Sequence, residues 1–127
     1  MMPAVLFAIH DQARRGALRD AAHDAGYRVH TAATLAEARR VLADTHVDVA
    51  FVDETLDATG DLAHALRRRQ TTPRARLVRL LAPAAGASAA ARAWRPDASL
   101  RADMPVETAL TLLQLLAPTA LVPSPST

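Results

Sequence analysis

Five short strand-like segments, separated by longer stretches with helical spacing, set the pattern of this chain. The two most continuous apolar runs are Val5–Ile9 and Val47–Asp53. A short apolar run bounded by polar residues is typical of a strand buried on both faces of a parallel sheet. Shorter segments at Arg28–Ala32, Arg76–Leu81 and Ala98–Leu100 predict three further strands.

Between the predicted strands Val5–Ile9 and Arg28–Ala32, apolar residues recur every three or four positions, as they do on one face of a helix. They are Ala13, Ala17, Leu18, Ala21, Ala22 and Ala25, and the charged residues Arg14, Arg15, Arg19, Asp20 and Asp24 are expected on the outer side. Gly26 predicts the end of this helix, with Tyr27 packing back on it. Thr34 and Glu37 form a capping-box sequence, which predicts the start of a second helix.

Three more helical segments are expected, over residues 60–69, 84–94 and 105–116. Arg67–Arg69 close the first of them, where cations suit the helix dipole. The second is rich in Ala and shows weak contrast between its faces. Pro105 suits the first turn of the last helix. Residues 119–127 carry a Pro-Ser-Pro-Ser sequence and are expected to be a flexible tail or the start of a linker.

A strand followed by a helix, repeated five times with short connections, predicts an α/β domain over residues 1–118. Its sheet would hold five parallel strands, with helices on both faces and right-handed crossovers. The flavodoxin-like order, 2-1-3-4-5, is the common solution at this size. It places the carboxyl ends of the first and third strands side by side. Asp53 ends the third strand at this edge, where open α/β sheets hold their chemistry, and is therefore the first candidate functional residue.

Composition excludes several classes of function. The chain has no Cys, which removes disulfides and thiolate chemistry. Apolar residues are 50% of the chain, yet no run has membrane-spanning length and no signal peptide is evident, so a cytoplasmic location without a membrane partner is expected. No glycine-rich phosphate loop or nucleophilic triad signature is present, so we expect no enzymatic activity and no catalytic residue.

All 15 cationic side chains are Arg, because the chain contains no Lys. The sequence pI of about 10.3 therefore reflects the high pKa of guanidinium, since the formal net charge is only +2. Few aromatic residues accompany these arginines. We interpret Arg67–Arg69 as a solvated helix end and expect no direct contact with nucleic acid.

Several short motifs, in this order and spacing, give the chain a family resemblance. They are Ala25-Gly26-Tyr27, Thr34-x-x-Glu37, the strand Asp48–Asp53, Gly60, and Pro105-Val106-Glu107. With them the chain resembles the receiver domain of bacterial two-component response regulators, from about Pro3 to Pro118. In that family an acidic pair after the first strand holds Mg²⁺, and an Asp ending the third strand accepts a phosphoryl group from a histidine kinase. A Thr or Ser ends the fourth strand and a Lys ends the fifth.

The resemblance makes Asp53 the phosphoacceptor candidate. It places the acidic pair on Ile9 and His10, neither of which is an acid, while Asp11 follows one residue later. His10 and Asp11 thus form a degenerate acidic pocket. Together with Asp53 they make a set of one imidazole and two carboxylates, but their spacing is not diagnostic of a metal site, and polar residues at a loop mouth are the favoured interpretation. We expect no metal site, Mg²⁺ binding that is weak, and no other cofactor.

The remaining family positions also depart from the pattern. The hydroxyl position falls on Leu81, and the Lys position falls near Ala102 or Asp103. Arg101 is close by, but a guanidinium is longer and planar and is not equivalent to an ammonium. Phosphoryl transfer needs cations to neutralise the charge that develops on oxygen.

The main functional hypothesis is therefore a degenerate receiver, or pseudo-receiver, that signals by protein–protein contact with weak or absent phosphorylation. Its partner would be another protein or a cognate histidine kinase, and it would be joined to an output domain in a larger regulator. One alternative is a conventional phosphorelay receiver that is phosphorylated on Asp53 with help from Asp11. Another is a flavodoxin-like domain that binds a small ligand in the strand-end crevice.

Two further features carry expectations. Residues 84–94, the fifth strand with Leu100 and the last helix are the candidate interface, for a homodimer or a heterologous contact. Trp94 lies in this region, and Trp is enriched at interface hot spots, although it would also serve to cover the core. Arg79 interrupts a strand expected to be buried, so its charge needs a carboxylate partner or an exit to water.

Overall fold

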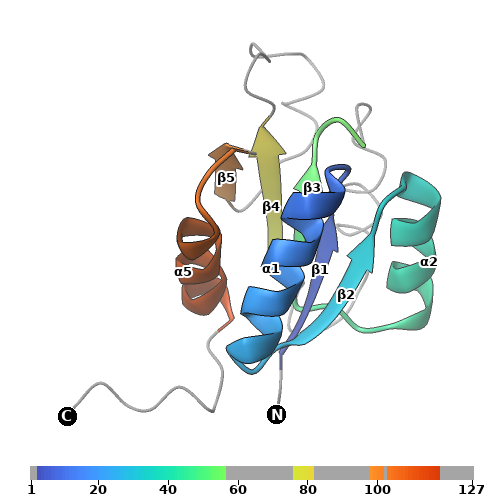
Figure 1. Ribbon diagram of the computed structural model, residues 1–127. Coiled ribbons are helices and arrows are strands. Elements are labelled where there is room, and N and C mark those ends of the chain that lie inside the picture. The colour runs from blue at the N-terminus through green and yellow to red at the C-terminus, as the bar shows by residue number, and fades with distance from the viewer. Residues whose placement is uncertain (1–2, 57–75, 82–97, 102, 118–127) are drawn as a thin grey trace.

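The computed structural model describes residues 3–56, 76–81, 98–101 and 103–117, and its centre is a five-stranded parallel sheet (Figure 1). The strands are β1 (Ala4–Ala8), β2 (Arg28–Ala32), β3 (Val49–Asp53), β4 (Arg76–Leu81) and β5 (Ala98–Arg101). Their order is β2-β1-β3-β4-β5, which confirms the predicted flavodoxin-like topology. The two most apolar strands are adjacent, with Val5 opposite Val49 and Ala8 opposite Val52.

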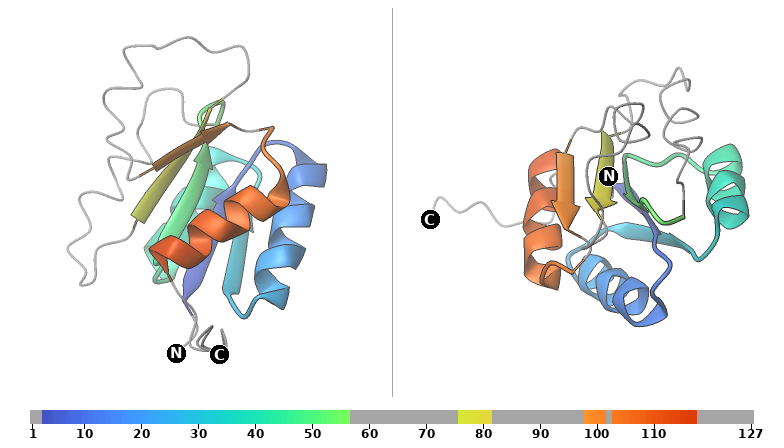
Figure 2. Two further views of the ribbon diagram at one scale, coloured as in Figure 1. Left: turned by 90° about the vertical axis from the view of Figure 1, so that its left-hand side faces the viewer. Right: turned by 90° about the horizontal axis from the view of Figure 1, so that it is seen from above.

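The described helices cover both faces of the sheet (Figures 1 and 2). Helices α1 (Gln12–Asp24) and α5 (Val106–Leu116) lie on one face, and α2 (Leu35–Asp44) lies on the other. None of the helices in the described part of the chain is long and apolar enough to cross a membrane. The predicted helices over residues 60–69 and 84–94, Trp94 and the tail from residue 118 lie outside the described residues.

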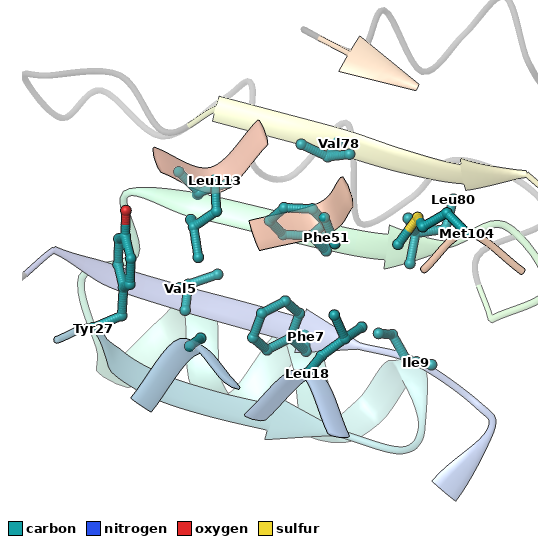
Figure 3. Close-up of a cluster of buried hydrophobic side chains, with 13 residues drawn as sticks. Val5, Phe7, Ile9, Leu18, Tyr27, Phe51, Val78, Leu80, Met104 and Leu113 are labelled. Carbon is teal, nitrogen blue, oxygen red and sulfur yellow. The ribbon is translucent and has the colours of Figure 1, made fainter. Parts of the chain in front are cut away.

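The face under α1 and α5 holds the larger aromatic core (Figure 3). Phe7 of β1 and Phe51 of β3 meet here, with ring centroids 5.2 Å apart and a tilt of 40°. Leu18 of α1 and Leu113 of α5 close the cluster from the helical side. The opposite face is packed with smaller residues, which are Leu6, Ala8, Ala32, Ala38, Leu42, Val47, Ala50, Val52 and Leu77.

Helix α1 ends as the sequence predicts. Gly26 adopts a φ of 96°, a left-handed conformation that suits glycine because it has no Cβ. The Tyr27 N–H then donates to the Ala22 carbonyl at 3.1 Å. The fully buried Tyr27 ring reaches the end of α5, where its hydroxyl donates to the Ala117 carbonyl at 2.7 Å. Burial raises the pKa of this phenol.

Helix α2 begins with the predicted cap. Thr34 Oγ1 accepts the Glu37 N–H at 3.2 Å, and Glu37 Oε2 accepts the Ala33 N–H at 3.1 Å. Such caps satisfy amide groups that the first helical turn leaves open. The carboxylate thus reaches the residue before Thr34, so the whole turn from Ala33 to Glu37 is fixed.

Four strand ends and the starts of α1 and α5 differ from the predicted bounds. Strand β1 begins at Ala4 instead of Val5, and α5 begins at Val106 because Pro105 is its N-cap residue. Strand β1 stops at Ala8 instead of Ile9, and β3 begins at Val49 instead of Val47. The reason at β3 is Asp48, whose side-chain Oδ2 replaces a backbone carbonyl as the acceptor of the Ala4 N–H at 2.8 Å. Strand β5 runs one residue further, to Arg101, and α1 begins one residue earlier, at Gln12.

Candidate functional site at the carboxyl edge of the sheet

Asp53 lies at the carboxyl end of β3 and is buried, with 7% of its surface exposed. Its Oδ1 accepts the Thr55 N–H at 3.0 Å, and its Oδ2 accepts the His10 N–H at a longer 3.4 Å. The Leu56 N–H also donates to the Asp53 carbonyl at 3.0 Å. One carboxylate therefore joins the loop after β1 to the loop after β3, which confirms that these two loops meet.

The residues of the loop after β1 do not converge on Asp53 through their side chains. Ile9 is 1% exposed and packs in the aromatic core, whereas His10 is exposed. Asp11 is also exposed and serves as the N-cap of α1, because its Oδ1 accepts the Ala13 N–H at 3.0 Å and the Arg14 N–H at 3.4 Å. Among the described residues, no three His, Asp or Glu side chains gather where they could hold a metal ion.

Two arginines of α1 hold the neighbouring loops in place. Arg15 Nη1 donates to the Ile9 carbonyl at 2.8 Å and to the His10 carbonyl at 3.3 Å. Arg14 Nη1 donates to the Met104 carbonyl, between β5 and α5. Both arginines are partly buried, which the expectation of an outer position did not include. The helical period alone could not show it, because the side chains bend back over the first turn to reach loop carbonyls.

Arg79 of β4 pairs with Glu54, the residue after Asp53. The two side chains are 10% and 11% exposed. Of the two expectations for Arg79, a carboxylate partner or an exit to water, the structure shows the carboxylate partner, which the sequence had not identified. The Arg79 side chain lies on the α2 face of the sheet, since it shares that face with Leu77, two residues earlier in β4, which belongs to that core.

The last strand brings no cation toward Asp53 among the described residues. Arg101 is 68% exposed and binds Asp103, with Nε–Oδ1 and Nη2–Oδ2 distances of 3.2 Å each. Leu81, at the position where the family carries a hydroxyl, is partly exposed. Leu100, a candidate interface residue, is partly buried and packs against the aromatic core.

Another titratable group lies away from this edge. His30 of β2 has a buried Nε2 with no hydrogen-bond partner in the described part of the chain. Burial, and secondarily the charge of Arg28, lower the pKa of this imidazole.

No protein-family model and no curated protein matches the sequence. Solved structures do match the fold. The chemotaxis response regulator CheY4 of Vibrio cholerae superposes with a TM-score of 0.78 at 22% identity, over 91% of this chain and 99% of that one.

Two larger proteins contain a similar domain. NtrX from Brucella abortus gives a TM-score of 0.77 at 15% identity, over 91% of this chain but only 26% of its own. The N-terminal domain of a response regulator/sensory box/GGDEF three-domain protein from Carboxydothermus hydrogenoformans gives 0.69 at 15% identity, over 89% and 92% of the two chains. The chain therefore has the fold of response-regulator receiver domains.

Proposed function

We propose that this protein is a signalling module on the receiver fold that acts by contact with another protein, without productive Mg²⁺-dependent phosphorylation and without catalysis of its own. The observation that carries the proposal is the hydrogen bonding of the Asp53 carboxylate. Both of its oxygens accept backbone N–H groups, one from each neighbouring loop. This carboxylate thus has a structural task that would compete with phosphoryl transfer.

The surroundings of Asp53 support the same conclusion. Attack on a phosphoryl donor requires cations that stabilise the oxygens of the transferred group. The acidic pair that would hold Mg²⁺ is replaced by a buried Ile9 and an exposed His10. Asp11, the alternative acid, is engaged as the cap of α1. The chain has no Lys to bind a phosphoryl oxygen, and Arg101 is turned to Asp103.

Intact-mass measurement tests the proposal. The protein is incubated with Mg²⁺ and acetyl phosphate, beside Asp53→Asn and a conventional receiver domain as controls. We expect a mass gain of one phosphoryl group only in the conventional receiver. A gain in this protein that disappears in Asp53→Asn would show a conventional phosphorelay receiver instead.

We also propose that the module works with an attached output domain. NtrX and the three-domain Carboxydothermus protein support this, because each places a similar domain within a longer chain. The coding sequence after Thr127 tests it directly. An immediate stop codon would contradict the proposal, and an open reading frame into a second domain would support it.

The proposed contact face comprises β5 and α5, with Trp94 from the preceding segment. Leu115 of α5 is 74% exposed, the one large apolar side chain so exposed in the described part of the chain. Light scattering of the wild type, Leu115→Glu and Trp94→Ala tests whether this face forms a homodimer. We expect a dimer that both substitutions weaken. A dimer that neither changes would exclude this placement, and a strict monomer would exclude self-association.

A further inference from the structure

The Arg79–Glu54 pair stands directly beside Asp53 and joins two strands at the candidate site. The Arg79 guanidinium lies in β4 and the Glu54 carboxylate follows β3. The backbone extends the same connection, since the Glu54 N–H donates to the Leu80 carbonyl at 3.1 Å. Leu56 then packs against the core on the α2 face. Glu54 is therefore held by both its backbone and its side chain.

Burial of this pair calls for an explanation other than stability. Two charges that are only 10% and 11% exposed lose most of their hydration. Replacement of such a pair by apolar residues of similar volume is often neutral or stabilising, whereas removal of one partner leaves an uncompensated buried charge. A pair of this kind therefore disfavours arrangements of the loop in which the two charges separate while they remain buried.

We infer that the Arg79–Glu54 pair is a conformational lock that holds the segment Glu54–Leu56 in one arrangement against β4. The lock fixes the surface at the carboxyl edge of β3 and β4 without any phosphoryl group. This deepens the proposed function and rests on it, because a module without a phosphoryl input needs a contact surface of constant shape.

Amide hydrogen exchange on the whole chain, without Mg²⁺ or a phosphoryl donor, tests the lock. The variants are Glu54→Gln, and the apolar double substitution Glu54→Leu with Arg79→Met. The matched control is Arg101→Met with Asp103→Leu, which removes an exposed ion pair. The amides of Thr55 and Leu56 report the locked segment, and those of Phe7 and Phe51 report the core. The measured quantity is the ratio of segment exchange to core exchange.

We expect the apolar double variant to have the same urea midpoint of unfolding as the wild type, or a higher one. Its ratio of segment exchange to core exchange should nevertheless rise about tenfold or more through local opening. Glu54→Gln should raise the ratio as well, and the exposed control pair should leave it unchanged. An unchanged ratio in the apolar double variant would show that the pair only fills space and would overturn the inference.

If the double variant does not fold, Glu54→Gln decides the question by the same ratio. A raised ratio supports the lock and an unchanged one refutes it. Failure of the lock can be distinguished from failure of the proposed function, since phosphorylation of Asp53 is measured separately by mass. A lock that fails beside an unphosphorylated Asp53 would leave the signalling proposal intact.

Discussion

Two aspartates bracket β3, and their surroundings differ in an instructive way. Asp48 precedes the strand at its amino end, where its Oδ2 accepts the Ala4 N–H at 2.8 Å and its Oδ1 lies 2.9 Å from His46 Nε2. Asp53 ends the strand, where its two oxygens accept the His10 and Thr55 amides. Both carboxylates thus connect β3 to the chain around β1. Position at the carboxyl edge alone does not distinguish a reactive carboxylate from a structural one.

The two aspartates have similar hydrogen-bond partners, but they differ in burial. Asp48 is partly exposed, whereas Asp53 is buried, with 7% of its surface exposed. Water therefore reaches the Asp48 carboxylate more readily than the Asp53 carboxylate. The comparison therefore predicts a larger stability effect at the carboxyl edge, and it can be tested by substitution.

The largest effect is expected for Asp53→Ala. It removes the charged acceptor of two amides, one in each neighbouring loop, and a hydrogen bond to a charged group contributes about 1.5–3 kcal/mol. We expect the free energy of unfolding in urea to fall by about 2–4 kcal/mol. An effect below that of Asp48→Ala would break the comparison, because it would mean that Asp53 has little structural role.

Asp48→Ala should cost less, about 1–2 kcal/mol, because it removes the acceptor of one partly buried amide and the partner of an exposed His46. The reciprocal bond from the Asp48 N–H to the Ala4 carbonyl, at 2.8 Å, remains in the variant. Urea unfolding measures the change. Asp48→Asn keeps an acceptor oxygen and should recover part of it.

Substitution of Asp11 sharpens the comparison, because it tests whether this carboxylate acts as a helix cap or as an acid of a metal pocket. Asp11→Ala should cost about 1 kcal/mol through loss of the N-cap. Asp11→Ser should recover most of this stability, since a hydroxyl also accepts from the first helical turn. Thermal or urea unfolding checks both variants. Failure of Ser to recover stability would argue against the capping role.

The smallest effect concerns pH. The folded pKa of His30 is lowered from 6.5, so the unfolded chain binds a proton more readily than the folded one. His30 therefore contributes stability above about pH 6.5, and this contribution is lost as the pH falls toward its folded value. We expect the free energy of unfolding to decline less between about pH 7 and pH 5 in His30→Gln than in the wild type. Equal slopes would contradict this.

Much of the fold follows from local pattern. The runs at β1 and β3, the Gly26 turn and the Thr34 cap each specify their structure within a few residues, and their sequence of strands and helices limits the topology to few choices. The expected strand order was confirmed for that reason. The bounds moved where a side chain took over a backbone bond, as Asp48 does at the start of β3.

The candidate site was less accessible to prediction. Asp53 could be singled out by its place at a strand end, but its amide partners depend on how two distant loops approach each other. The same holds for Arg79. Its place in a buried strand showed that the charge would need a partner or water, but it did not show that Glu54 would be the partner. Arg14 and Arg15 were expected on the outer side of α1, but their loop contacts could not be predicted, because helical periodicity describes where a side chain starts and not where a long one ends.

The most direct test of the central claim follows the His10 and Thr55 amides by NMR while Mg²⁺ and beryllofluoride are added. Beryllofluoride imitates a phosphoryl group on a carboxylate. If the oxygens of Asp53 stay committed to these two amides, neither resonance should shift beyond the small changes that salt produces. Saturable shifts of both resonances that disappear in Asp53→Asn would contradict the account, because they would show that Asp53 exchanges its amide partners for a phosphoryl analogue.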